Sequence, residues 1–148
     1  MYFNGIQSYR KTDIFTSDPV KLVITCYEGA IESLKLAKEK MEEEDYEKKG
    51  KAIIKAQNII EELLCSLDFE KGGVIASNLS NLYNYMLRRI LIGDVNKDMR
   101  AIDEVIGMLD ELLLAWKSIH VQKDNETQTR ADNLSQNRTA MASGYISV

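Results

Sequence analysis

Four segments of this 148-residue chain repeat apolar residues at steps of three and four, and short connections separate them. Such a spacing places apolar side chains on one stripe of an α-helix. Each helix would be roughly 30 Å long at about 1.5 Å per residue, so a short connection cannot lead back along it. Neighbouring helices must therefore run antiparallel. The sequence predicts an all-α fold, an antiparallel up-down-up-down four-helix bundle within residues 1–120, with helices over 18–42, 46–67, 72–93 and 97–120.

Residues with known preferences for helix ends mark the boundaries of these segments. Asp18 followed by Pro19 is typical of a helix start, and Asp45 is placed to cap the second helix. Gly72 and Gly73 suit a connection before the third helix because glycine tolerates a positive φ. Gly93, followed by Asp94, is the predicted stop of that helix.

The two ends of the chain differ in composition from the predicted bundle. Residues 1–16 mix aromatic and aliphatic side chains with polar ones at no steady period, which favours an arm that lies on an apolar surface. Residues 121–148 are rich in Asn, Gln, Thr and Ser and poor in apolar groups, so we expect a polar, disordered and flexible tail.

Composition limits the partners and the cellular location. A net charge of −4 offers no basic footprint for nucleic acid. No segment has the apolar length of a signal peptide or of a membrane span, so we expect a cytoplasmic protein without membrane insertion. The two cysteines, Cys26 and Cys65, lie inside helical patterns without a CxxC spacing, which favours reduced packing thiols.

No pattern of catalytic or metal-binding residues is present. The single histidine, His120, lacks the Glu-x-x-His spacing of a carboxylate-bridged metal site in a bundle. No glycine-rich phosphate loop or nucleophile elbow occurs. We therefore expect no enzyme activity and no cofactor. A histidine phosphotransfer bundle that uses His120 and a structural adaptor bundle remain as alternatives to a binding module.

The segment 70–94 combines a core stripe with an unusual polar cluster. We assign Ile75, Leu79, Met86 and Ile90 to the core because they share one stripe. Tyr85, Arg88 and Arg89 fall outside that stripe, and such a set is most often a solvated face. However, an apolar arm together with more apolar helix surface than a four-helix core consumes suggests a groove for a protein partner.

Five blocks carry a family resemblance: GIQSY at 5–9, SDPVKLVITCYEGAI at 17–31, KAQNIIEEL at 55–63, EKGGVIASNLSNLYNYMLRRIL at 70–91 and AIDEVIGMLDELLLAWKSI at 101–119. In this order they resemble the FliS family of flagellin export chaperones. The resemblance implies a cytoplasmic four-helix bundle that binds the C-terminal segment of flagellin. It also implies that the bundle prevents premature polymerisation and assists delivery to the flagellar type III export apparatus, without enzyme activity or cofactor.

The resemblance also implies where the client binds. In the family, the N-terminal segment covers part of the client groove, which makes Tyr9, with Ile6, the predicted gating arm. We predict groove residues that combine membership of a family block with a flank or rim position: Leu22, Cys26, Gly29, Ser33, Ala56, Gln57, Ile60, Asn78, Leu82 and Tyr85. The sequence leaves open whether export-gate proteins or a co-chaperone also bind, and whether the client-free protein forms a homodimer.

Overall fold

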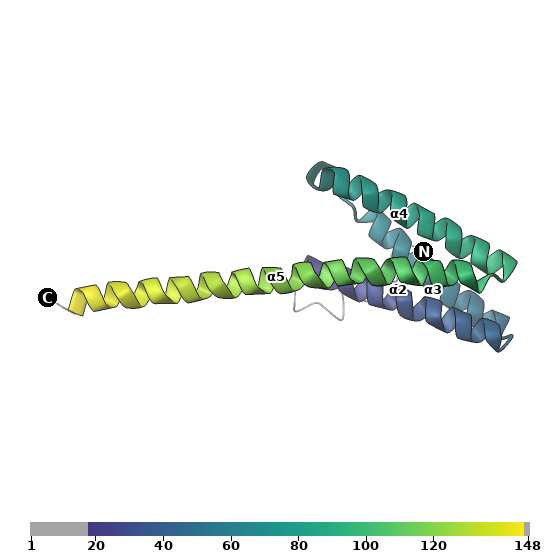
Figure 1. Cartoon of the computed structure of the whole chain (residues 1–148), viewed down its shortest axis with the longest axis horizontal. Helices are drawn as coiled ribbons and strands as arrows, with labels where there is room; N and C mark the ends of the chain where they lie inside the picture. The colour runs from purple at the N-terminus through teal and green to yellow at the C-terminus, as the bar shows by residue number, and fades with distance from the viewer. Residues whose placement is uncertain (1–17, 147–148) are drawn as a thin grey trace.

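The computed structural model describes the backbone of residues 18–146 and the side chains of residues 18–139. Four helices follow one another: α2 (Pro19–Glu42), α3 (Tyr46–Cys65), α4 (Phe69–Asn96) and α5 (Met99–Ile146). Each packs against the next, and α5 returns to pack against α2, so the four close a ring. Figure 1 shows successive helices running in opposite directions. The predicted antiparallel four-helix bundle is confirmed.

The core consists of the predicted apolar stripes of all four helices. Because the period of these stripes matches the helix, successive layers fall on the face that meets the neighbouring helices. The central layers are almost completely buried, and they are formed by Tyr27, Ala30, Leu34, Ala56, Ile59, Ile60, Tyr83, Met86, Ile90, Ile102, Val105 and Leu109.

The predicted caps of α2 and α3 are present. The Asp18 carboxylate accepts a hydrogen bond from the Val20 backbone N–H at 3.0 Å, and Pro19 occupies the first turn. Asp45 accepts from the Lys48 N–H at 3.2 Å. Each carboxylate satisfies a backbone donor that has no partner within the helix.

The glycine pair before α4 lies inside the helix instead of in a connection. Asp68 caps α4 by accepting from the N–H groups of Glu70 and Lys71, so the helix begins before the glycines. Gly73 then has φ +49° and ψ −123°, which produces a kink. The predicted positive φ is present, but it kinks the helix instead of preceding it.

Alanine substitutions at two glycines should have opposite effects on stability. Gly73→Ala should destabilise the fold by about 1–3 kcal/mol because a side chain opposes its backbone conformation. Gly50→Ala should stabilise it by about 0.5–1 kcal/mol, since Gly50 is helical and an added Cβ meets no atom within 4 Å. Urea unfolding measures both free energies. Equal effects of the two substitutions would show that the kink carries no strain for alanine.

Gly93 serves a purpose other than the predicted helix stop. The helix continues to Asn96, and Lys97 provides the left-handed cap with φ 54°. A Cβ on the buried Gly93 would lie 2.9 Å from Ile102 Cδ1 and 3.0 Å from the Asp98 carbonyl oxygen. The absence of a side chain at Gly93 therefore allows the start of α5 to approach α4.

The chain after His120 differs in conformation from the flexible tail expected from its composition. Its side chains are exposed throughout residues 121–139, as their polarity predicts, but α5 continues to Ile146 and projects away from the bundle (Figure 1). Proline is absent after His120. The Thr127 and Thr129 hydroxyls donate to carbonyls one turn earlier, and Gln128 donates to Asp132. These local contacts are compatible with a continuous helix.

Candidate functional site

An apolar cleft of about 350 Å³ opens at the end of the bundle where α4 begins. All four helices contribute to its wall. The apolar lining comes from Val23, Leu63, Leu67, Ile75, Ala76, Leu79, Tyr83 and Trp116, and the polar lining from Ser66, Asp68 and Lys71. A concave apolar surface with a few charged groups at its edge is typical of a binding site.

The cleft exists because the first turns of α4 do not complete the core. Val74 and Ile75 follow the Gly73 kink and are 76% and 70% exposed. Ile75 was predicted to be core, and this assignment is wrong, since the side chain lines the open cleft. Leu79, one turn on, is partly buried against the core, whereas the predicted core residues Met86 and Ile90 are fully buried. The core side of α4 closes only after its first turns.

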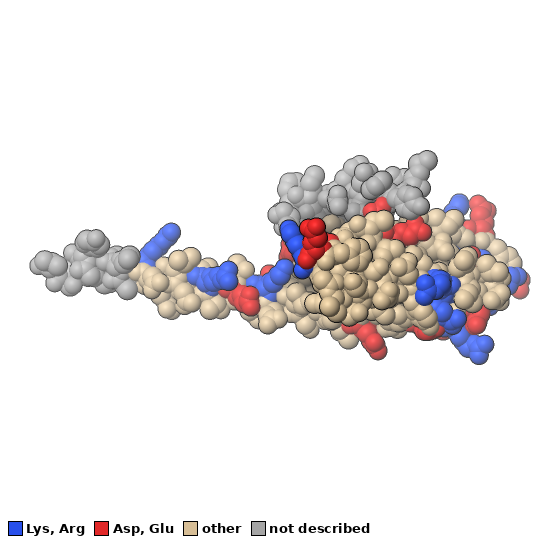
Figure 2. All heavy atoms as spheres, turned by 90° about the horizontal axis from the view of Figure 1, so that it is seen from above, with Lys and Arg blue, Asp and Glu red and all other residues tan. Residues whose placement is uncertain are grey.

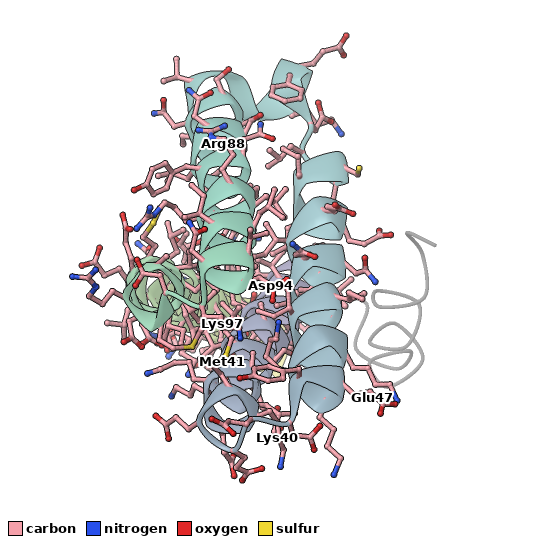
Figure 3. All side chains as sticks on the ribbon, turned by 90° about the vertical axis from the view of Figure 1, so that its right-hand side faces the viewer. Lys40, Met41, Glu47, Arg88, Asp94 and Lys97 are labelled. Carbon is pink, nitrogen blue, oxygen red and sulfur yellow. The ribbon has the colours of Figure 1, made fainter. Side chains whose placement is uncertain are left out.

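The other end of α4 is held firmly to its neighbours. Lys49 Nζ lies 2.5 Å from Asp94 Oδ1, and Lys97 Nζ lies 4.4 Å from the centre of the Tyr46 ring. Figure 3 shows Asp94 and Lys97 at the end of the bundle where α2 turns into α3. The ion pair and the cation–π contact join α3 to the end of α4. The cleft between α4 and the other helices therefore lies at the start of α4 and not at its end.

Aromatic side chains form the floor of the cleft. The Tyr27 and Tyr83 hydroxyl oxygens are 2.5 Å apart in the core. The rings of Tyr27 and Trp116 have centroids 6.5 Å apart. Burial raises the pKa of both tyrosines above the usual value, so both hydroxyls stay neutral. Tyr83 and Trp116 thus present a fixed, uncharged aromatic surface to the cleft.

The predicted groove residues divide by burial. Half-buried or exposed positions are Leu22, Gln57, Asn78, Leu82 and Tyr85, and buried positions are Cys26, Gly29, Ser33, Ala56 and Ile60. Of the buried set, Cys26, Ala56 and Ile60 belong to the core cluster. Ile6 and Tyr9 lie outside the described residues. None of the ten described residues lines the cleft, and their role as client contacts stays a prediction.

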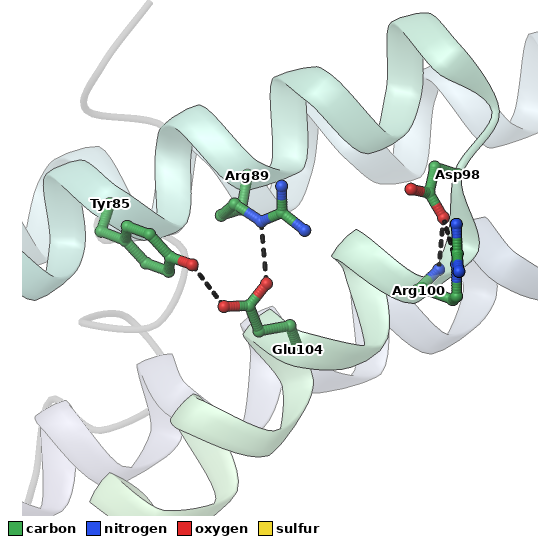
Figure 4. Close-up of polar contacts among 5 residues, drawn as sticks. All are labelled: Tyr85, Arg89, Asp98, Arg100 and Glu104. Carbon is green, nitrogen blue, oxygen red and sulfur yellow. Dashed lines mark hydrogen bonds and ion pairs between the residues drawn. The ribbon is translucent and has the colours of Figure 1, made fainter.

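Tyr85 belongs to a polar bridge between α4 and α5 that the sequence does not predict. Its hydroxyl donates to one oxygen of Glu104, and Arg89 Nε donates to the other at 2.8 Å (Figure 4). The hydrogen bond from Tyr85, helped by Arg89, lowers the pKa of the Glu104 carboxyl. Tyr85 and Arg89 are one helical turn apart, but nothing in that spacing identifies the acid on the next helix.

His120 lies between two carboxylates. Its Nδ1 is 3.2 Å from Asp18 Oδ2, and its Nε2 is 3.4 Å from Asp124 Oδ2. A phosphoryl group on either nitrogen would meet a negative charge, which disfavours the phosphotransfer alternative.

Among the described residues, no three side chains of metal-binding type gather in one place. None of the helices in this part of the chain combines the length and the hydropathy needed to cross a bilayer.

The surface around α4 carries exposed apolar residues beyond the cleft. Leu91, Ile92 and Val95 are 54%, 41% and 71% exposed. Figure 2 views the molecule from above and shows an area without Lys, Arg, Asp or Glu side chains, bordered by acidic and basic groups. Exposed apolar area of this kind often marks a protein-interaction surface.

Comparisons with known proteins agree with this architecture. The family described as "Flagellar protein FliS" matches residues 2–123. The flagellar secretion chaperone FliS of Salmonella typhimurium is 40% identical over 121 residues, covering 78% of this chain and 90% of that protein. The Bacillus subtilis and Escherichia coli proteins of the same name are 31% and 32% identical, covering 77% and 76% of this chain and 84% and 87% of their own.

A solved structure shares the fold. It is described as a flagellar chaperone from bacteria and superposes with a TM-score of 0.67 at 24% identity. The match covers 78% of this chain and 94% of the solved chain. With the family match over most of its length, the chain belongs to the FliS family, which is a family of flagellar secretion chaperones and not of enzymes.

Proposed function

We propose that the protein is a cytoplasmic export chaperone that binds the C-terminal segment of flagellin and keeps it from polymerising before export. It then assists delivery of flagellin to the flagellar type III export apparatus. The observation that carries this proposal is the open apolar cleft, lined by all four helices, in a member of a flagellar chaperone family.

The cleft and the apolar surface of α4 suit a client that folds as it binds. An amphipathic segment can order along the bundle and bury its apolar side chains against Ile75, Leu79 and Trp116. Ordering the segment costs about 2–5 kcal/mol, which keeps a wide contact releasable. A segment held in this way cannot pack against a second flagellin, so binding also blocks polymerisation.

The predicted arm and groove complete the proposal. Tyr9 and Ile6 would cover part of the client surface until flagellin arrives, and the half-buried Leu22, Gln57 and Leu82 would contact the client outside the cleft. Export-gate proteins or a co-chaperone would bind the outer face of the loaded bundle. Affinities of Tyr9→Ala and Gln57→Ala variants for the flagellin segment would test the arm and the groove separately.

Trp116, the single tryptophan, reports directly on the cleft. Titration with a flagellin C-terminal fragment should shift its fluorescence to saturation and raise the melting temperature of the bundle, because binding stabilises the folded state. An adaptor bundle without a client groove would show neither change. Acid-labile phosphate on His120 after incubation with a phosphodonor, without flagellin binding, would support the phosphotransfer alternative instead.

A further inference from the structure

Glu62, on α3, is a buried acid without a partner. It is 7% exposed, and every other buried residue of α3 is apolar. Its Oε1 atom has almost no exposed surface and accepts no hydrogen bond. Among the described residues, none of the ion pairs includes Glu62. A buried carboxylate that lacks donors destabilises the fold that contains it.

The polar side chains near Glu62 do not supply the missing donor. Ser66 lies one turn later on α3, but its hydroxyl donates to the Leu63 carbonyl oxygen at 2.7 Å. Asn58 lies one turn earlier and makes no hydrogen bond to Oε1. Lys71 is a cation of the cleft wall, and it forms no ion pair with any described residue. Native proteins rarely keep such an unsatisfied group without a use for it.

Glu62 lies at the border of the apolar cleft. At 3.6 residues per turn, the residues that follow one another round α3 at steps of about 40–60° are Leu67, Leu63, Ser66 and Glu62. The first three line the cleft. A helical side chain covers the turn before its own Cα, so Ser66 lies over the turn that starts at Glu62. Glu62 is therefore the next residue round the helix from the polar edge of the cleft.

The chemistry of the missing partner follows from the carboxylate. A carboxylate accepts hydrogen bonds and donates none, and its strongest partners are guanidinium and ammonium groups. The aliphatic stem of an arginine or lysine can lie along an apolar wall while its charged end reaches a polar edge. A partner that fits has apolar side chains that fill the cleft and a basic side chain that reaches Glu62.

We propose that Glu62 is the acidic anchor of the client site and binds an arginine or lysine of the flagellin segment. The inference rests on the proposed function and adds the chemistry of one client residue to it. The side-chain torsions of Glu62 let the carboxylate turn toward the cleft edge when the client covers the cleft. Because the carboxylate is already desolvated in the client-free bundle, pairing relieves an unfavourable state and fixes the register of the client.

Glu62→Gln distinguishes an anchor for the client from a structural role. The amide keeps the shape and removes the charge, so the client-free variant should unfold at the same urea concentration as the unchanged protein or at a higher one. Its affinity for a flagellin C-terminal fragment, measured through Trp116, should fall by roughly 10-fold or more. Loss of stability in the client-free variant would show that Glu62 already has a partner in its own chain, such as Arg10 or Lys11, and would overturn the proposal.

Glu61→Gln is the matched control. Glu61 precedes Glu62 on α3, is half-buried, and loses the same charge on substitution. Its affinity for the fragment should stay within about threefold of the unchanged protein, because most residues near a binding site contribute little. Equal losses of affinity in the two variants would show a general effect of charge and would contradict an anchor at Glu62.

Variants of the fragment identify the partner of Glu62. Each arginine and lysine of the fragment is replaced by glutamine in turn and titrated against the unchanged protein and against Glu62→Gln. One replacement should weaken binding to the unchanged protein by roughly 10-fold and have little further effect on Glu62→Gln, since that pair is already broken. If every replacement acts equally on both proteins, Glu62 binds no basic side chain and the inference fails alone. A fragment that does not bind the unchanged protein would disprove the proposed function itself.

Discussion

Ile75→Asp should weaken binding of the flagellin C-terminal segment by roughly 10- to 100-fold while the bundle stays folded. Ile75 is 70% exposed and lines the cleft, so an aspartate there removes no core packing. When a client covers the cleft, however, the carboxylate loses water and gains no partner in an apolar wall. The measurement is the Trp116 fluorescence titration, with circular dichroism to confirm the helical content.

Ile54→Asp is the matched control for this experiment. Ile54 is also an exposed isoleucine, at 57%, but it lies on α3 and does not line the cleft. Its affinity should stay within about threefold of the unchanged protein, as for most residues outside a binding hot spot. If both variants bind equally well, the cleft at the start of α4 does not hold the client.

Removing the hydroxyl of Tyr27 should destabilise the bundle by about 1–3 kcal/mol. Tyr27→Phe leaves the buried Tyr83 hydroxyl without its partner. Tyr83→Phe should cost a similar amount, because it leaves the buried Tyr27 hydroxyl without its partner in the same way. The double variant should be more stable than the sum of the two single effects predicts, since it leaves no orphaned tyrosine hydroxyl.

Urea unfolding of the four proteins forms a double-mutant cycle that measures this coupling. Additive effects would show that the two hydroxyls do not stabilise each other.

The same tyrosine pair predicts that the bundle loses stability at alkaline pH. Both tyrosines have a folded pKa raised above the usual 10.0, so their contribution is fully present below pH 10 and is lost as the pH rises above it. The double variant should lose less stability between pH 9 and pH 11 than the unchanged protein, at roughly 1.4 kcal/mol per pH unit and group at most.

Helix ends could be predicted where a single residue decides them. Asp18 and Asp45 cap their helices as expected, because a cap depends on a side chain and the backbone two or three residues away. The role of a glycine is harder to predict, because a turn, a helix stop, a kink and a close helix contact can all require the same residue type. Gly73 produces a kink and Gly93 allows close packing, and only the neighbouring helix distinguishes these uses from a turn or a stop.

The cleft could not be predicted from periodicity. Ile75 continues the same stripe as Met86 and Ile90, yet it is exposed because the beginning of α4 leaves the core side open. Conversely, Cys26 and Ile60 were placed in the groove as flank residues and are buried in the core cluster. A stripe shows which face of a helix turns inward, but not how far along the helix a neighbour covers it.

The sequence by itself determined the number of helices, their antiparallel order, the caps of α2 and α3 and the FliS family, because these depend on local spacing and on residue identity in order. Only the tertiary structure decided where the bundle stays open, that Glu104 binds Tyr85 and Arg89, and that α5 runs on as a helix past the end of the bundle. These features depend on how far apart neighbouring helices lie along their whole length. That separation is set jointly by side chains from several helices, and no single segment encodes it.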